Sequence, residues 1–450
     1  MTGTSSLMSL ANSTAAAIRG RRAPWVIFVA ALTARLLQIF IVGELPTDDT
    51  PDYDEIALNL LSGDGFVSRE NWFGFEMYSW RAPAYPFLLA AIYAVFGYTH
   101  TAALTVQALI GAATAVVVYD LGRRLHPPSA FLAGGIAAAY EPLIRATSTL
   151  STEPLFILLS VTAVQQLLVG LPSEGRAQGG AIQGGPGRFH WVLCGVITGA
   201  AALTRPVGLV LLPVQVGIWY WRDRAEPGRP KVWIRRSLWL SLGIALTITP
   251  WTLRNYHIHG QLVPISTHGG FIFARSNAAE PDWKKGGQAW RIDQEFFVSM
   301  PTETARNSYW VSQGTDYIRS NPAHYLRLVG ERLLRFWYFF ESQYNFWFMS
   351  LLPFFVAGLA RFGSHDRYAL LTTFMGVSLA VFCLVLYASV RFRLALEPFF
   401  ILYASSYIRD HWDRFGAART RRTLALVLAV NGIVWWQDEA LRQTALGFLR

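Results

Sequence analysis

The chain has 450 residues, of which 52% are hydrophobic, 14% aromatic and only 15% charged, whereas a soluble domain averages about 25% charged residues. This composition excludes an ordinary soluble globular protein and predicts an integral membrane protein. The net charge of +10 would suggest nucleic acid as the partner of a soluble chain. Here the arginines cluster between apolar runs, as in cytoplasmic loops, so we expect no nucleic acid. Cys194 and Cys383 both lie inside apolar runs, so we expect no disulfide framework.

The first apolar run covers residues 24–43, about the 20 residues that cross roughly 30 Å of hydrocarbon. It follows a basic leader over residues 1–23, which includes Arg19, Arg21 and Arg22. A secretory signal peptide has a shorter apolar core and a small-residue cleavage site after it, whereas Glu-Leu-Pro follows here at residues 44–46. We therefore predict a retained anchor with its amino end in the cytoplasm.

A polar, acidic segment over residues 44–101 follows this first crossing. Within it, residues 83–98 form an apolar run of only about sixteen residues that carries Pro83 and Pro86. The run is short for a crossing, and both prolines restrict the helix. We predict a juxtamembrane or re-entrant helix here and place the whole segment outside the cytoplasm.

Ten further apolar runs bring the predicted total to about eleven crossings. They cover residues 102–122, 129–147, 153–170, 190–204, 207–222, 236–251, 345–361, 367–388, 394–409 and 422–437. Lys and Arg collect in cytoplasmic loops, and with this topology Arg123, Arg124 and the basic runs at 222–236 and 409–422 all fall inside. The acidic segment and Glu153 then fall together at the outer face.

Two long connections complete the organisation. Residues 171–189 are Gly-rich and predict a flexible cytoplasmic loop. Residues 252–344 form a large outer loop, which is longer than a plain connector needs to be. Its helical end carries apolar residues on one face and arginines nearby, which predicts an interfacial helix; these are Leu326, Val329, Leu333, Phe336 and Phe340, with Arg327, Arg332 and Arg335. The predicted divisions are the leader 1–23, a transmembrane module 24–251, the outer loop 252–344 and C-terminal helices 345–450.

Several short motifs follow one another in a recognisable order. They are Asp49, Tyr53, Ala57, residues 59–61, Gly63, Gly65 and Phe66; Arg81, Pro83, Tyr85 and Pro86; Phe96 and Gly97; LSTEPLF at 150–156; LTRP at 203–206; PWTLRNY at 250–256 with Gly269 and Gly270; and RFRLALEP at 391–398. This order resembles the family 39 type of the GT-C glycosyltransferases, which includes protein O-mannosyltransferases and the aminoarabinose transferases of lipid A. The likeness runs from about residue 24 to about residue 405.

The resemblance implies an all-α, polytopic membrane enzyme of the GT-C fold with about eleven crossings and juxtamembrane helices in its first outer loop. It implies transfer of a sugar, hexose or pentose, from a polyprenyl-phosphate carrier to an acceptor outside the cytoplasm, at the cytoplasmic (inner) membrane. Such a reaction needs a base for the acceptor and cationic groups for the departing phosphate. We expect the lipid-linked donor, membrane lipids and an acceptor of unknown class (protein, lipid or glycan) as partners.

Asp49 is the predicted general base, because it stands four residues before Tyr53 as the family's first-loop Asp does. Asp48 and Asp52 are the alternatives, and the chain departs from the commoner Asp-Glu pair, since Thr50 follows Asp49. Asp49 could instead cap the helix that begins near Asp52. Glu153 stands at the end of a span, where related transferases have a second acidic residue, and is the second catalytic candidate; otherwise it is a cap or an ion-pair partner.

Planar guanidinium groups suit a lipid phosphate because they bind two of its oxygens at once. The candidates are Arg205, Arg254, Arg391, Arg393 and Arg81, each of which could instead extend to lipid headgroups. For acceptor binding or positioning we name Tyr53, Tyr85 and His268. The spacing of His257, His259 and His268 suits no metal site, so we predict no cofactor requirement and leave dependence on a divalent metal open.

Two other function classes remain as alternatives. A lipid-linked glycan ligase or polymerase would share the donor class but not the order of motifs. A lipid or sugar transporter would carry internal repeats and ionisable residues at mid-membrane; the sequence shows no repeat, and Arg35 in the first span is the exception to charges that gather at one face.

Overall fold

The computed structural model describes residues 3–47, 49–69, 74–170, 186–223, 232–279, 281, 299–337, 345–386 and 390–437, with the backbone alone for 3–21. Asp48, Phe340 and most of the predicted Gly-rich loop lie outside these residues. The described part is helical, with no strand, and its only ladder contact is a bridge between Ser68 and Met77. The predicted all-α class is confirmed.

The helices follow one another with short connections. They are α1 (Gly3–Val42), α2 (Thr50–Ser62), α3 (Ala84–Phe96), α4 (His100–Leu125), α5 (Ala130–Ala139), α6 (Glu141–Arg145), α7 (Glu153–Gly170), α8 (Arg188–Thr204), α9 (Leu211–Asp223), α10 (Val232–His259), α11 (His268–Ser276), α13 (Glu303–Ser320), α14 (Pro322–Phe336), α15 (Phe346–Phe362), α16 (Asp366–Leu384), α17 (Val390–Leu394) and α18 (Glu397–Trp436). Short 3-10 turns at Pro127–Ser129, Ala146–Ser148 and Pro206–Val210 join some of them.

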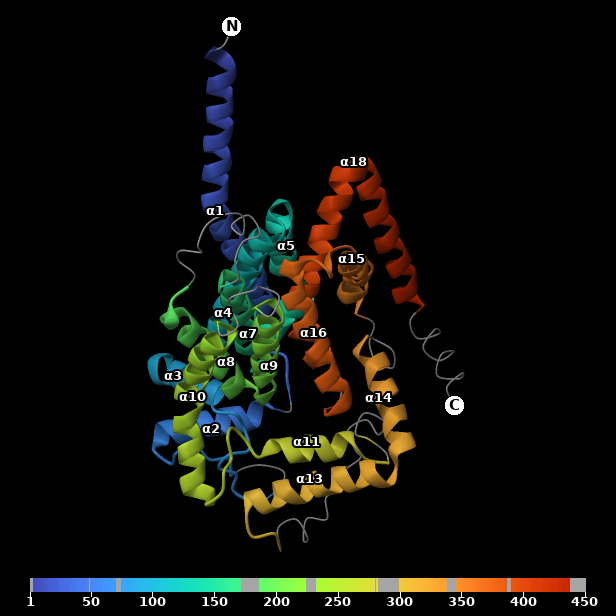
Figure 1. Ribbon diagram of the computed structural model, residues 1–450. Helices are drawn as coiled ribbons and strands as arrows, with labels where there is room; N and C mark the ends of the chain where they lie inside the picture. The colour runs from blue at the N-terminus through green and yellow to red at the C-terminus, as the bar shows by residue number, and fades with distance from the viewer. Residues whose placement is uncertain are drawn as a thin grey trace.

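Each predicted crossing falls on one of these helices or on half of one. Four described segments are long and apolar enough to cross a membrane by themselves: Arg22–Val42, His100–Leu125, Glu153–Gly170 and Arg367–Leu384. The predicted crossings at 394–409 and 422–437 are the two halves of α18. Gly416 separates them with φ 77° and ψ 168°, in the region open mainly to glycine, and the two halves form the legs of a V in Figure 1.

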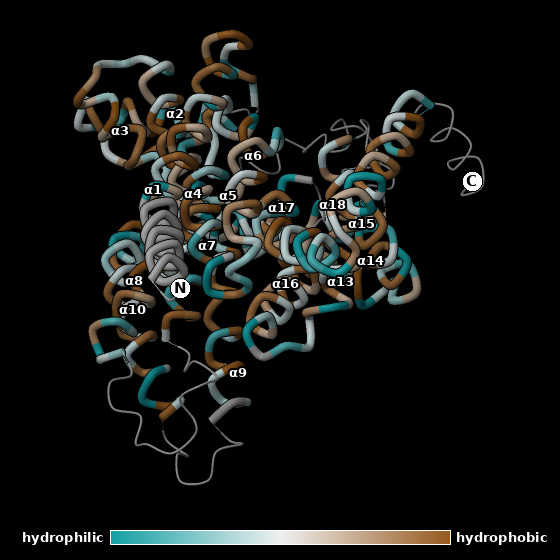
Figure 2. The backbone as a smooth tube through the Cα atoms, turned by 90° about the horizontal axis from the view of Figure 1, so that it is seen from above, coloured by the Kyte–Doolittle hydropathy of each residue, from teal (hydrophilic) through white to brown (hydrophobic). Residues whose placement is uncertain are grey.

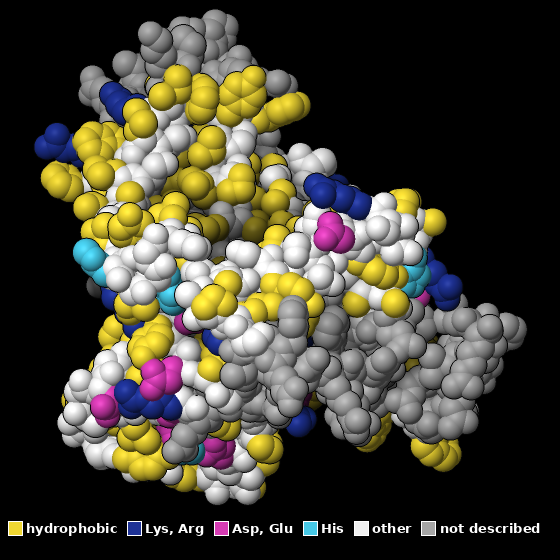
Figure 3. All heavy atoms as spheres, turned by 90° about the horizontal axis from the view of Figure 1, so that it is seen from below, with side chains coloured by type: hydrophobic (Ala, Val, Ile, Leu, Met, Phe, Trp, Pro, Cys, Tyr) yellow, Lys and Arg dark blue, Asp and Glu magenta, His cyan; other side chains and the backbone are white. Residues whose placement is uncertain are grey.

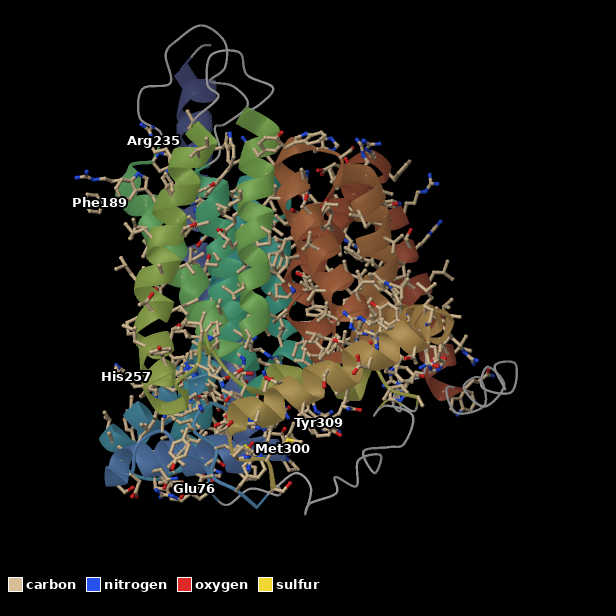
Figure 4. The ribbon with its side chains drawn as sticks, turned by 60° about the horizontal axis from the view of Figure 1, so that its bottom comes forward. Glu76, Phe189, Arg235, His257, Met300 and Tyr309 are labelled. Atoms are coloured by element: carbon tan, nitrogen blue, oxygen red, sulfur yellow. The ribbon has the colours of Figure 1, made fainter. Side chains whose placement is uncertain are left out.

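The long helices run side by side and the short ones gather at one end. Figure 1 shows α2, α11 and α13 at the end of the bundle opposite the N-terminus, which we call the α2 end. Figure 4 places Arg235 and Phe189 at the other end, away from His257, Tyr309 and Glu76. Viewed along the bundle, α1, α4, α8 and α10 form one group and α15 and α18 another, with α2 and α3 at the rim (Figure 2).

Helix α3 confirms the predicted juxtamembrane helix. Its 13 residues span only about 20 Å at 1.5 Å per residue, short of the roughly 30 Å of a bilayer core. It packs against α2, and Tyr85 and Leu89 face the interior. The chain therefore stays at the α2 end between α1 and α4.

Close glycine contacts bring the backbones of α8 and α10 together. A Cβ atom on Gly195 would lie 2.1 Å from the carbonyl oxygen of Leu240, and one on Gly243 would lie 2.1 Å from that of Val192. Any larger residue would force the helices apart. Small residues of this kind drive helix association in membranes, where van der Waals packing replaces the hydrophobic effect.

Buried arginines bind backbone carbonyl groups inside the bundle. Arg35 of α1 donates to the carbonyls of Ala138 (3.2 Å) and Ala137 (3.4 Å). These carbonyls lie at the end of α5, which stops before the Glu141–Pro142 step, so Arg35 satisfies acceptors that a helix end leaves open. This accounts for the one charge that the sequence places inside the first span.

The amphipathic helix α14 is anchored more deeply than an interfacial helix would be. Arg332 is fully buried, and donates to the carbonyls of Cys383 (2.8 Å) and Ser276 and to Oδ1 of Asn277 (2.8 Å). Phe336 is buried, whereas Leu326 is 68% exposed. The helix thus ties α11 to the end of α16 instead of lying free at the membrane surface.

The topology predicts which exposed positions can be labelled. Thr101 and Pro128 are both exposed, at opposite ends of α4. In intact cells a membrane-impermeant maleimide should react with Thr101→Cys and leave Pro128→Cys unmodified until the cells are permeabilised. The native cysteines are both buried and give the background. The reverse labelling pattern would invert the topology.

The ion pair of Arg393 and Glu397 predicts a stability effect. Both side chains are fully buried and 2.8 Å apart, so Glu397→Leu leaves a buried cation without its partner and should lower the free energy of unfolding by about 3–5 kcal/mol. Arg393→Met combined with Glu397→Leu should recover most of this loss. Asp413→Ala breaks an exposed pair with Arg409 on the same helix and should cost under about 0.5 kcal/mol. Denaturant titration of the detergent-solubilised protein measures all three; equal losses in all three would contradict the assignment.

Candidate functional site

The start of α2 presents two acidic side chains to the interior of the α2 end. Asp49 occupies the cap position, but its side chain makes no capping hydrogen bond. Instead, Arg81 binds both acids: its Nη2 lies 2.9 Å from Asp49 Oδ1 and 2.6 Å from Asp52 Oδ2. The guanidinium also stands over the ring of Tyr53, 5.1 Å from its centroid. Arg81 is therefore fixed by two carboxylates and an aromatic face.

A second arginine joins this pair to the start of α7. Arg391 of α17 donates from Nη1 to Asp49 Oδ2 (2.7 Å) and from Nε to Glu153 Oε1 (2.6 Å). Arg205, which follows α8, lies 3.1 Å from the same oxygen of Glu153. The five residues Arg81, Asp49, Arg391, Glu153 and Arg205 form what we call the ion-pair chain. It gathers segments that are up to 342 residues apart in sequence.

The members of the ion-pair chain differ in their access to solvent. The side chains of Arg81 and Arg205 are 12% and 17% exposed and that of Glu153 6%, whereas that of Arg391 is 43% exposed. Arg391 is thus the cation most accessible to an incoming anion. Seen from the α2 end, the surface is hollowed near its centre and hydrophobic side chains surround the hollow (Figure 3).

Electrostatics separate the two acids bound by Arg81. Burial opposes ionisation of Asp49, but the guanidinium groups of Arg81 and Arg391 outweigh it and hold the pKa of this carboxyl well below its usual value. Burial raises the pKa of Asp52 despite the same Arg81. In turn, Asp49 and Glu153 raise the pKa of Arg391 against the effect of burial. Asp49 is consequently ionised at neutral pH.

His268 and the two tyrosines lie at different depths around Arg81. Burial, with Arg81 nearby, lowers the pKa of His268 to about 3, so its imidazole is neutral, and its ring lies 4.4 Å from that of Trp80. Tyr53 packs edge-on against Tyr85 at 5.1 Å. The hydroxyl of Tyr85 is fully buried and donates to Gln107 (2.8 Å). Tyr85 therefore supports Tyr53 from the core, whereas His268 lies in the wall near Arg81.

Two of the predicted phosphate-binding arginines lie apart from the ion-pair chain. Arg254 donates to the carbonyls of Tyr78 and Phe66 and stands over the ring of Trp251. Arg393 is buried in the bundle against Glu397, Phe336 and Phe348. The guanidinium groups of both serve the fold, because backbone and aromatic partners occupy them. The spacing Arg391-Phe-Arg393 turns only the first arginine toward Asp49.

Sequence reasoning missed Glu303, which is buried close to the site. Its carboxylate accepts hydrogen bonds from the backbone amides of Tyr78 and Ser79 and from the Thr267 hydroxyl. In the sequence it looks like an ordinary acidic residue in the first turn of a helix, after the cap Thr302. No local pattern distinguishes it. Within the described residues, no group of three or more His, Cys, Asp and Glu side chains is arranged to hold a metal ion.

The comparisons with known proteins agree with this architecture. Residues 80–252 match the family described as dolichyl-phosphate-mannose-protein mannosyltransferase. No curated protein matches the sequence. The structure of ArnT from Cupriavidus metallidurans bound to undecaprenyl phosphate is 14% identical, with a TM-score of 0.53 over 93% of this chain and 63% of that one.

A second group of similar structures comes from an archaeon. The oligosaccharyltransferase AglB from Archaeoglobus fulgidus, in complex with an inhibitory peptide and a dolichol-phosphate, is 12% identical, with a TM-score of 0.58. The match covers 92% of this chain and 54% of that one, so the chain spans about half of AglB and under two thirds of ArnT. Identities this low establish the fold alone. The resemblance seen in the sequence is confirmed: the chain is a multi-pass membrane protein with the fold of the GT-C glycosyltransferases.

Proposed function

We propose that the protein transfers a sugar from a polyprenyl-phosphate carrier to an acceptor at the α2 end of the bundle, on the extracytoplasmic face of the cytoplasmic membrane. The observation that carries the proposal is the ion-pair chain, in which three arginines and two carboxylates alternate at one end of an apolar bundle. The names of the similar proteins support the donor class, since two of those structures hold dolichol-phosphate and undecaprenyl phosphate.

The arginines supply the cationic half of the reaction. As the bond between the anomeric carbon and the phosphate oxygen breaks, negative charge grows on the lipid phosphate. Arg391 and Arg205 stabilise it through paired N–H donors, which match phosphate geometry. Arg391 is the exposed member of the pair, so it meets the phosphate first. Without the donor, Asp49 and Glu153 compensate its charge.

Asp49 supplies the base. Its carboxylate is ionised, and it accepts the acceptor's proton as oxygen attacks the anomeric carbon. When the phosphate draws Arg391 away, Asp49 loses one of the two cations that hold its pKa down and becomes a stronger base. Glu153 keeps Arg391 and Arg205 close together, and Asp52 holds Arg81. His268, Tyr53 and Tyr85 are proposed to position the acceptor or its neighbours.

A second candidate is transfer of a whole lipid-linked glycan, and the similarity to AglB, an oligosaccharyltransferase, is the observation that favours it. Both reactions use the same cationic site. Mass spectrometry of lipids and glycans from cells with and without the gene separates them, because the mass added to the acceptor is one sugar in the first case and an oligosaccharide in the second. No change in any glycan or lipid would contradict both.

Asp49→Asn should abolish transfer because it keeps the shape of the side chain and removes the base. In proteoliposomes supplied with membrane lipids from the native cells, we expect the rate to fall by about 10²- to 10⁴-fold. Binding of undecaprenyl phosphate should persist, since the substitution frees arginine donors. Asp52→Asn should have a milder effect, because Asp52 contacts Arg81 alone within the ion-pair chain. Turnover of Asp49→Asn at the wild-type rate would rule out Asp49 as the base.

Arg391→Ala should weaken binding of undecaprenyl phosphate at least tenfold, since a charge-assisted hydrogen bond contributes about 1.5–3 kcal/mol. Native mass spectrometry of the purified protein measures the binding. Arg69→Ala is the matched control, because Arg69 makes only surface ion pairs with Asp64 and Glu76. Undecaprenol, which lacks the phosphate, should bind the wild type and both variants equally. Equal loss for Arg69→Ala and Arg391→Ala would indicate a diffuse charge effect instead of a site.

A further inference from the structure

Glu303 lies at the meeting point of two loops that lead into the site. It is the first residue of α13, and its side chain is only 5% exposed. Its carboxylate accepts from the amide of Tyr78 at 2.8 Å and from that of Ser79 at 3.2 Å, over more than 220 residues of sequence, and from the hydroxyl of Thr267. Burial of a carboxylate is costly unless N–H and O–H donors replace water, and here these donors do so.

The two loops are also bonded to each other and continue directly into site residues. The amide of Thr267 donates to the carbonyl of Ser79 (2.8 Å). The next residues after this contact are Trp80 and Arg81 on one loop and His268 on the other, and the rings of Trp80 and His268 lie 4.4 Å apart. One carboxylate therefore fixes the backbone just before Arg81 and just before His268.

Helix α10 fixes the same segment from the opposite side. The hydroxyl of Ser79 donates to Asn255 Oδ1 (2.9 Å), and Nε2 of His259 lies 2.8 Å from that hydroxyl. These contacts hold the side chain of Ser79, whereas Glu303 holds the backbone amides of Tyr78 and Ser79. Loss of Glu303 would leave both amides buried without this acceptor, a costly state that the segment can relieve only by moving.

We propose that Glu303 is a positioning residue for the transfer reaction: through the amides of Tyr78 and Ser79 and the hydroxyl of Thr267 it sets the placement of Arg81 and His268. It does not contact the ion-pair chain itself. Arg81 carries its effect to Asp49, which lies 2.9 Å from the guanidinium. The large loop after α10 is thereby coupled to the catalytic carboxylate, and the kinetic part of this inference rests on the proposed function.

Hydrogen–deuterium exchange tests the structural part without any assay of activity. In the purified full-length protein, the amides of Tyr78 and Ser79 should be protected, and Glu303→Ala should speed their exchange at least tenfold. Glu303→Gln keeps an acceptor oxygen in place and should retain most of the protection. Tyr317→Phe is the matched control on α13, since it removes one hydrogen bond, to His324, far along the helix, and it should leave exchange at 78–79 unchanged. Unaltered exchange in Glu303→Ala would overturn the proposal.

A double-mutant cycle tests the kinetic part. If Glu303 acts through Arg81, Glu303→Ala should lower kcat at least tenfold alone and have little further effect in Arg81→Ala. Independent losses that multiply in the double variant would overturn the proposal while leaving the proposed function intact. Failure of the wild type to transfer any sugar would instead contradict the proposed function, and the exchange data would still decide the structural part. If Glu303→Ala does not fold, Glu303→Asp withdraws the same charge by one methylene and serves in both experiments.

Discussion

Alternation of guanidinium and carboxylate groups is the constraint on which the site depends. Arg81, Asp49, Arg391, Glu153 and Arg205 come from four separate parts of the chain, and each inner member has an opposite charge on both sides. Like charges forced together in a poorly hydrated place would repel strongly. In this order, attraction draws the first loop, the start of α7, the end of α8 and α17 together and leaves Arg391 accessible.

The same side chain type serves two purposes in this fold, and surroundings decide which. Arg35 and Arg332 bind carbonyl groups at helix ends and connections, and Arg393 pairs with a buried glutamate. Their donors are committed to the structure. Arg391 and Arg205 pair instead with acids at the edge of the bundle, where an anion with more charge can compete for the same donors. Partner chemistry therefore separates structural arginines from those proposed to bind phosphate.

Glycine contacts and the short helix α3 shape the space around these charges. The backbones of α8 and α10 meet at Gly195 and Gly243, which places Arg205 and Arg254 at the ends of two tightly joined helices. Arg254 binds the carbonyls of the first loop, and Glu303 binds its amides. Opposite faces of one loop segment are thus fixed by a cation and an anion, and Arg81 follows that segment directly.

The sequence by itself determined the helical class, the positions of the apolar segments and the juxtamembrane nature of residues 84–96. These properties depend on local hydropathy, length and proline content, which can be read from consecutive residues. The order of motifs likewise pointed to the GT-C fold. It also named all five members of the ion-pair chain among its candidates, because charged residues at the ends of apolar runs are few.

Only the tertiary structure decided which of those candidates meet. Arg391 and Arg393 are two residues apart, yet the turn of α17 sends one to Asp49 and the other into the bundle. Asp49 could have been a helix cap on local grounds, and its ion pairs depend on residues 32 and 342 positions away. Glu303 was invisible for the same physical reason: its partners are backbone amides of a distant loop, and an amide carries no sequence information.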